Sequence, residues 1–160
     1  MTLTLRSSAF DAAQPIPPRY SRDGGNVSPE LAWNESPAGT QTLALVVDDP
    51  DAPRGVFTHW VMFNIPGALD GLPTGVPSGD HPADAGTQGR NDFGDTGYGG
   101  PQPPPGKPHH YRFTLYALDA TLPLRPGATK QQVLDAMRGH VLGQAQLVGI
   151  YENRAIGASR

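Results

Sequence analysis

Several short stretches of this chain have the patterns of β-strands: some alternate between apolar and polar residues with a two-residue period, and others are apolar throughout. The longest stretches cover residues 42–47, 58–65 and 111–118, and shorter ones cover residues 2–10, 31–33 and 145–151. The first two are almost continuously apolar, which predicts strands that are buried on both faces. The pattern as a whole predicts a mainly β fold with antiparallel pairing.

Strict alternation also predicts which side chains share a face of a strand. Within residues 58–65, one face carries His59, Val61, Phe63 and Ile65, and the other carries Trp60 and Met62. Beyond residues 42–47, Asp49 and Asp51 continue the face of Leu43, Leu45 and Val47. In the third strand, His109 shares a face with Tyr111.

One segment has the periodicity of a helix instead. Thr129 is a suitable N-cap, and Gln132 three residues later completes a capping box. The apolar residues that follow at helical spacing are Val133, Leu134, Met137, Val141 and Leu142. Gly143 ends the pattern, so we expect a single late helix that packs against the sheet.

The composition fits many short strands joined by turns. The 20 glycines and 18 prolines among 160 residues separate runs that contain Phe, Tyr and Trp. Many of them lie in residues 66–108, and a loop of this length is usually functional or disordered. We expect Phe93 and Tyr98 to anchor it. The chain length predicts a single domain, residues 1–160.

Cysteine content, charge and hydropathy exclude several classes of protein. The chain has no cysteine, which excludes a disulfide framework and a thiolate metal site. The formal net charge of -3, without a Lys/Arg cluster, argues against nucleic-acid binding. No apolar run reaches the length of a transmembrane segment and no signal peptide is visible, so a cytoplasmic location is expected.

Ionisable side chains stand at the ends of three predicted strands. Asp49 follows residues 42–47, His59 opens the second strand, and His109 and Tyr111 open the third. If these strands are neighbours in one sheet, a carboxylate, two imidazoles and a phenol meet in a pocket. Such a pocket can donate hydrogen bonds to an anion, and its carboxylate can hold an imidazole or a ligand cation.

Two other uses of these side chains are open to the same residues. A two-histidine, one-carboxylate metal site would combine His59, His109 and Asp49. No pair of them has short-range ligand spacing, and His109 and His110 face opposite ways on a strand, so we expect no metal. An enzyme would use Asp49 with His59 or His109 as acid and base, but no Gly-x-Ser-x-Gly motif supplies a nucleophile.

Four motifs lie in order between residues 48 and 111. They are Asp48-Asp49-Pro50-Asp51-Ala52-Pro53, Thr58-His59-Trp60, Gly97-Tyr98-Gly99-Gly100-Pro101 and His109-His110-Tyr111. Together they resemble the phosphatidylethanolamine-binding protein family, in its bacterial and archaeal branch often called Raf-kinase-inhibitor-like. Several dispersed motifs in the same order make this resemblance specific.

The resemblance implies a β-sandwich-like fold with a large central antiparallel sheet, a smaller sheet and one late helix. It also implies an anion pocket without catalytic residues, cofactor or metal, lined by Asp49, Asp51, Pro53, His59, Gly100, Pro101, His109 and Tyr111. Family members are described as binding phosphorylated headgroups, and some inhibit kinases or serine proteases. The implied ligand is a phosphate, a phosphorylated headgroup or a carboxylate, and the implied protein partner is a kinase or a protease. Whether two copies form a homodimer is left open.

This sequence departs from the family pattern at several positions. His110 stands where the family usually has arginine, and an arginine follows the tyrosine at Arg112. Gln102 and Arg22 stand where cysteines are common, and the chain stops soon after its last strand without a further helix. We interpret the chain as a non-catalytic binding protein. The alternatives are the acid–base enzyme and an inhibitor of other proteins that does not use the pocket.

Overall fold

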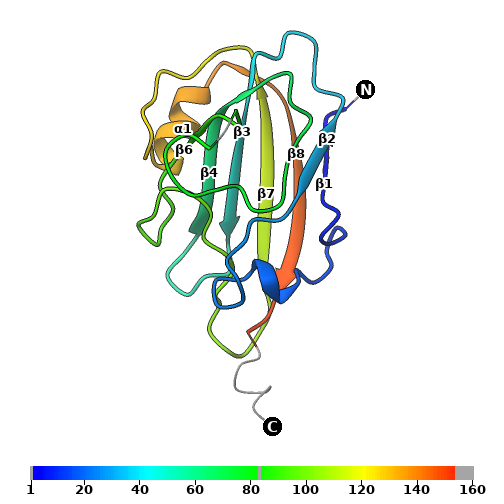
Figure 1. The fold of residues 1–160 in the computed structure, drawn as a ribbon, viewed down its shortest axis with the longest axis vertical. Coiled ribbons are helices and arrows are strands. Elements are labelled where there is room, and N and C mark those ends of the chain that lie inside the picture. Colours follow the sequence, from blue (N-terminus) through cyan, green and yellow to red (C-terminus); the bar gives the residue numbers. More distant parts are fainter. Residues whose placement is uncertain (1, 83, 154–160) are drawn as a thin grey trace.

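In a computed structural model, which describes residues 2–82 and 84–153, the chain forms two antiparallel sheets and one α-helix (Figure 1). The five-stranded sheet has the order β6-β4-β3-β7-β8 and the three-stranded sheet the order β1-β2-β5. The strands are β1 (Thr4–Arg6), β2 (Leu31–Asn34), β3 (Thr42–Asp49), β4 (Phe57–Pro66), β5 (Gly71–Leu72), β6 (Thr87–Gln88), β7 (His109–Leu118) and β8 (Val141–Tyr151). The helices are α1 (Lys130–Met137) and a short 3-10 helix, η1 (Pro18–Tyr20). The prediction of a mainly β fold with a large sheet, a smaller sheet and a late helix is confirmed.

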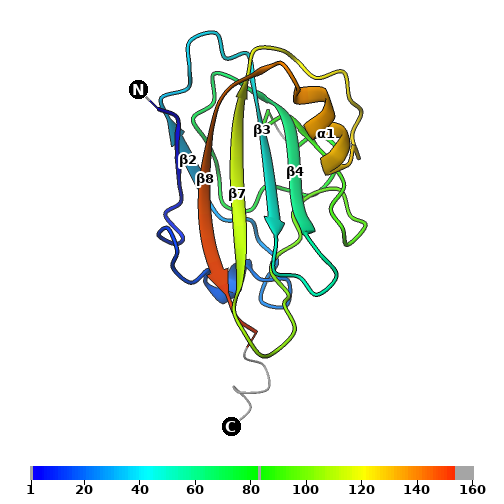
Figure 2. The ribbon, with the colours of Figure 1, turned by 180° about the vertical axis from the view of Figure 1, so that it is seen from behind.

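The large sheet has a hydrophobic core on each face. Every residue of β3 is buried, as the continuous apolar run predicts. One face packs against the small sheet, and Trp33, Leu45 and Phe113 are central to that core. The other face packs against α1 through Val61, Val133 and Met137 (Figure 2). The strand β3 is therefore fixed by two layers, and its last residue, Asp49, has a well-defined position.

The helix begins where the sequence predicts and ends earlier. The Thr129 side chain accepts from the Gln132 backbone N–H at 3.2 Å, and the Gln132 side chain accepts from the Thr129 backbone N–H at 2.9 Å. The prediction that the helix extends to Gly143 is wrong, because Gly139 adopts a φ of 81° and β8 begins at Val141. Residues 141–151 form backbone hydrogen bonds along β7, which an isolated extension of the helix would not gain.

Two irregularities in β4 overturn the predicted division of its faces. The pairing with β3 shifts between Val47 and Asp48, where His59 is the extra residue, and again opposite Ala44, beside Asn64. Each extra residue reverses the alternation. Val61 and Phe63 therefore face α1, whereas Ile65 lies in the other core together with Trp60 and Met62.

Short elements and buried polar side chains hold the long segment at residues 66–108. Gln88 is fully buried, accepts from the Trp60 indole N–H at 2.8 Å and donates to two carbonyls of the loop. The Asn91 side chain bonds three backbone groups of residues 93–97. Tyr98, one of the two expected anchors, is buried and donates to the Tyr20 carbonyl at 2.6 Å. This segment therefore meets the sheet next to His59.

No helix in the part of the chain that the structure describes is long and apolar enough to cross a membrane. The end of the predicted polar tail, residues 154–160, lies outside the described residues, so the expectation that no further helix follows the last strand is not tested there.

Candidate functional site

A pocket of about 260 Å³ opens at the end of the large sheet where β3 ends and β4 and β7 begin, the lower end in Figure 1. Its lining consists of Asp49, Ala52, Pro53, Phe57, His59, Phe93, Gln102, Pro103, Pro104, His109 and Tyr111. Because β3 is paired with both β4 and β7, the three strand ends bring their polar side chains to one place. The sequence-predicted meeting of Asp49, His59, His109 and Tyr111 is thus present in the structure.

Asp49 and His109 form a buried pair. The His109 Nδ1 atom lies 2.6 Å from Oδ2 of Asp49, and both side chains are 4% exposed. A carboxylate only accepts hydrogen bonds, so the shared hydrogen lies on Nδ1 and Nε2 is left for a ligand. The other oxygen of Asp49 accepts from the Asp51 backbone N–H at 2.8 Å. Asp49 thus fixes the orientation of the His109 ring.

His59 is held in its neutral form with a defined tautomer. Its Nδ1 donates to the Gly99 carbonyl at 2.7 Å, and the Gly99 N–H donates to the His59 carbonyl at 2.9 Å. Burial lowers the pKa of His59, and the hydrogen bond to Gly99 and the charge of Asp49 offset this only in part. The neutral imidazole therefore has its hydrogen on Nδ1, and Nε2 is an acceptor.

Tyr111 presents a buried hydroxyl without a partner. Its side chain is 1% exposed, and its oxygen has no hydrogen-bond partner among the described residues. Burial, and then the charge and the proximity of the Asp49 carboxylate, raise the pKa of Tyr111, so the group remains a neutral O–H donor; the carboxylate lies near the hydroxyl but forms no hydrogen bond with it by distance and angle. Buried polar atoms are usually satisfied, and this one belongs to a residue that lines the pocket.

Aromatic rings form one wall of the pocket. The ring of Phe57 lies 4.7 Å from that of Phe93 and 4.9 Å from that of His59, measured between centroids. His59 in turn makes an edge contact with Tyr111 at 5.1 Å. Among the described residues, no Lys or Arg lines the pocket, and its one carboxylate is Asp49. A ligand therefore meets apolar walls and a few directed polar atoms, as in most small-molecule sites.

Three of the predicted pocket residues, Asp51, Gly100 and Pro101, are not part of its lining. Asp51 lines an adjoining hollow that shares Pro53 and His109 with the pocket. Asp51 lies in a turn beyond the end of β3, so the strand alternation that linked it to Asp49 no longer applies. Its carboxylate accepts from the backbone N–H and from Nδ1 of His110, both at 2.8 Å. Gly100 and Pro101 are buried; the Gly100 N–H donates to the Asn26 side chain, and Pro101 lines a larger hollow nearby. Pro53 does line the pocket.

Sequence reasoning missed several lining residues. Phe57 stands one position before the predicted strand, and Phe93 was expected only as an anchor of the loop. Ala52 and Gln102 lie in irregular segments whose approach to the pocket has no periodic signal. Among residues 2–82 and 84–153, no three His, Asp or Glu side chains are grouped so as to hold a metal ion.

Comparison with known proteins identifies the family. Residues 6–152 match the family model described as phosphatidylethanolamine-binding protein. The chain belongs to the phosphatidylethanolamine-binding protein family. It is 52% identical over 149 residues to a UPF0098 protein from Methanothermobacter thermautotrophicus, an alignment that covers 93% of this chain and 98% of that protein.

Two solved structures of phosphatidylethanolamine-binding protein relatives share the fold. One, from Chlamydia trachomatis, is described provisionally as a homologue of this family; it is 37% identical with a TM-score of 0.86 and covers 95% of this chain and 98% of its own. Escherichia coli YbcL, described as a member of the mammalian family, is 32% identical with a TM-score of 0.87, and the match covers 96% and 99%. The names of these relatives state no enzymatic reaction.

One departure from the phosphatidylethanolamine-binding protein pattern, Gln102, lines the pocket, whereas His110 and Arg112 do not. On the opposite face of β7, Arg112 Nε donates to Asp48 at 2.8 Å. Lys130, the first residue of α1, donates to the other oxygen of Asp48 at 2.8 Å. His110 points to the surface and pairs with Asp51. The predicted opposite orientations of His109 and His110 are confirmed.

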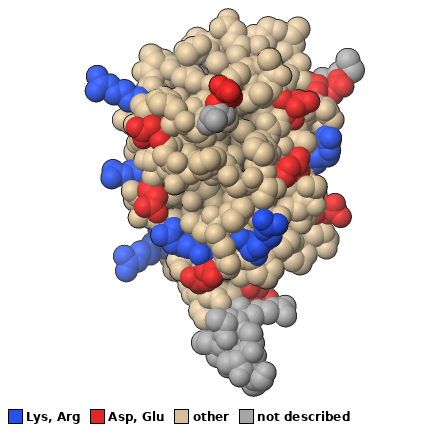
Figure 3. Space-filling view, viewed as in Figure 1, with Lys and Arg blue, Asp and Glu red and all other residues tan. Residues whose placement is uncertain are grey.

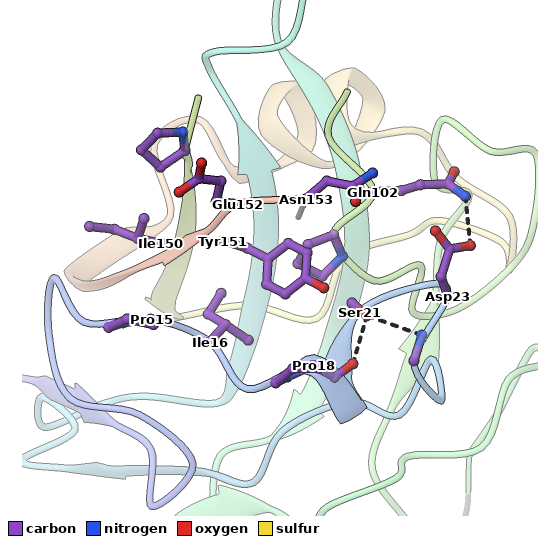
Figure 4. A pocket seen from close by; sticks show the side chains of 13 residues that line it. Pro15, Ile16, Pro18, Ser21, Asp23, Gln102, Ile150, Tyr151, Glu152 and Asn153 are labelled. Carbon is purple, nitrogen blue, oxygen red and sulfur yellow. Dashed lines mark hydrogen bonds between the residues drawn. The ribbon is translucent and has the colours of Figure 1, made fainter. Parts of the chain in front are cut away.

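A second, larger hollow of about 770 Å³ adjoins the pocket and shares Gln102 with it (Figure 4). Ile16, Ile150 and Tyr151 contribute apolar surface, and the Gln102 amide donates to Asp23 at 3.1 Å. Its lining has no counterpart of the buried Asp49–His109 pair. On the molecular face in Figure 3, acidic and basic side chains lie intermingled.

Proposed function

We propose that this phosphatidylethanolamine-binding protein relative is a non-catalytic binding protein whose pocket holds a phosphate or carboxylate group of a small molecule or a peptide. The observation that carries the proposal is the Tyr111 hydroxyl, a neutral donor that is buried beside the Asp49–His109 pair and has no partner among the described residues. A ligand oxygen would give that hydroxyl its acceptor.

His109 adds a second contact in this proposal. With Nδ1 bound to Asp49, its Nε2 donates to an anion when the imidazole is cationic, and a charge-assisted hydrogen bond of this kind is about twice as strong as a neutral one. His59 contributes a wall and an acceptor, because its only hydrogen is bound to Gly99 at neutral pH. Family membership supports a ligand-binding role, and the anion class is our inference from these atoms.

The test is a titration with inorganic phosphate and with phenyl phosphate, followed by NMR and calorimetry. Both ligands should shift the signals of His59, His109 and Tyr111 together. His109→Ala should weaken binding by about 1.5–3 kcal/mol, the usual value for a hydrogen bond to a charged group. His110→Ala is the matched control, because it removes the neighbouring imidazole from the opposite face of β7.

Two results would contradict the proposal. One is absence of binding at millimolar ligand, and the other is equal affinity of wild type and His109→Ala. Release of inorganic phosphate from phenyl phosphate at a rate that depends on His109 would favour an acid–base enzyme instead. A cytoplasmic location and a kinase or protease as protein partner remain predictions from the sequence.

A further inference from the structure

A cation lies directly behind one wall of the pocket. The guanidinium carbon of Arg22 is 3.8 Å from the centroid of the Phe93 ring, a stacking distance. Phe93 lines the pocket, and Arg22 does not. The Phe93 ring therefore contacts both the space for the ligand and a positively charged group.

The Arg22 charge is only partly neutralised by its neighbours. Its Nη2 lies 3.6 Å from the carboxylate of Asp95, and its Nη1 is buried without a hydrogen-bond partner among the described residues. The Arg22 side chain is 30% exposed, whereas that of Asp95 is 61% exposed. Water screens the exposed carboxylate more than the covered guanidinium, so Asp95 offsets only part of the Arg22 charge at Phe93.

The position of Arg22 is fixed by the same loop that orients His59. The Arg22 backbone N–H donates to the Pro101 carbonyl at 3.0 Å. Phe93 packs against the backbone of Gly99, where an added Cβ would lie 2.5 Å from the ring, and Gly99 accepts from His59. Arg22, Phe93 and His59 thus form a chain of contacts, in which the Phe93 and His59 rings meet edge to face with centroids 5.4 Å apart.

We propose that Arg22, acting through Phe93, gives the pocket its preference for anions. The inference rests on the proposed function. Among the described residues, the lining of the pocket includes no Lys or Arg, so a bound anion makes no direct ion pair there with either residue type. Other basic groups close by are His109, which is paired with Asp49, and Lys107, which lines an adjoining hollow. A guanidinium over the face of Phe93 draws the ring's electrons toward itself and makes the rest of the ring less repulsive to an anion. Arg22 therefore determines the charge preference of the pocket without contacting the ligand.

The experiment compares Arg22→Met, Arg22→Lys and Arg138→Met with the wild type. Methionine keeps a flexible apolar side chain against Phe93 but removes the charge, and lysine keeps the charge without the planar stack. Arg138→Met is the control, because it makes the same change in net charge at a distant surface site. The Arg138 side chain is 78% exposed and pairs with Asp135. Calorimetry measures inorganic phosphate affinity, and NMR titration of His59 measures the electrostatic potential inside the pocket without any ligand.

Arg22→Met should weaken phosphate binding about fivefold, the effect of a unit charge roughly 8 Å away in a partly screened site. It should also raise the pKa of His59, because a guanidinium near the ring disfavours the imidazolium. The charges of Asp49 and Asp92 act on His59 in the opposite direction and raise its pKa. Arg22→Lys should restore most of both values, and Arg138→Met should change neither.

Equal losses in Arg22→Met and Arg22→Lys would overturn the inference, because packing rather than charge would then be responsible. An unchanged His59 pKa in Arg22→Met would overturn it as well. Failure of the wild type to bind phosphate would refute the proposed function instead, and in that case the His59 titration alone would decide whether Arg22 sets the potential.

Discussion

Removal of the Tyr111 hydroxyl should affect stability and binding in opposite directions. Tyr111→Phe keeps the ring, which is fully packed in the core next to His59, and deletes only the buried oxygen that has no partner among the described residues. If the hydroxyl served only the fold, its deletion would lower the free energy of unfolding of the protein. If the hydroxyl serves a ligand, its deletion lowers the affinity of the protein for that ligand.

The magnitudes follow from the burial and the charge state. An unsatisfied buried hydroxyl costs about 1–3 kcal/mol, and access of water through the pocket mouth lowers that cost, so the ligand-free variant should gain about 1 kcal/mol in unfolding free energy. The raised pKa of Tyr111 keeps the hydroxyl protonated, so it donates to a bound phosphate. Its loss should then weaken binding by about 1.5–3 kcal/mol, roughly 10- to 150-fold.

Urea unfolding at increasing phosphate concentrations measures both effects in one series. Ligand stabilises the native state by RT ln(1 + [L]/Kd), so the wild type should gain more stability from phosphate than the variant, and the two curves should cross. Tyr116→Phe on the opposite face of β7 is the control, and it should respond to phosphate like the wild type. A variant that is less stable without phosphate and responds to phosphate in parallel with the wild type would refute the reasoning.

Three further predictions concern the surroundings of the pocket. The pKa of His59 is lowered in the folded state, so its neutral side chain contributes stability above the unfolded pKa of about 6.5, and this contribution is lost as pH falls through the lowered value. The free energy of unfolding of His59→Gln, measured with urea, should therefore depend less on pH between about 7 and 5 than that of the wild type. Asp48→Asn should destabilise the fold by about 1–2 kcal/mol in urea unfolding, since it weakens two ion pairs at 2.8 Å, to Arg112 and Lys130, whose cationic side chains are 37% and 26% exposed and so partly screened. Treatment with EDTA should leave phosphate affinity unchanged in calorimetry, and a loss restored by zinc or iron would support a metal site.

The regular strands were predictable because each has buried neighbours on a fixed side. In β7, Tyr111, Phe113 and Leu115 alternate without interruption and all lie in the core between the sheets. The start of α1 was predictable for a local reason, since the Thr129 capping box uses only residues within one turn. Its end was not, because Val141 and Leu142 match helical spacing but gain backbone pairing with β7. That competition depends on a strand some 30 residues earlier, which periodicity does not detect.

The same distinction separates the pocket residues that alternation places correctly from those that it does not. Asp49, His109 and Tyr111 stand on uninterrupted strands, and alternation places them correctly. His59 reaches the pocket only because a bulge turns it there, so its predicted place beside Val61 and Phe63 is wrong although its presence in the pocket is right. Asp51 was assigned by extending β3 past its last paired residue.

The polar end of the large sheet is a poor design for stability alone. Burying the Asp49–His109 pair removes two ionisable groups from water, and apolar residues of similar volume are often as stable or more so in such positions. The bulge at His59 interrupts the β3–β4 ladder at the same place, and the Tyr111 hydroxyl is buried beside it without a partner. These three features coincide within one pocket, whereas the rest of β3 and β7 is packed with apolar side chains on the same face. Local violations of otherwise consistent rules concentrate at functional sites, which is why we assign binding to this end of the sheet rather than to the larger apolar hollow beside it.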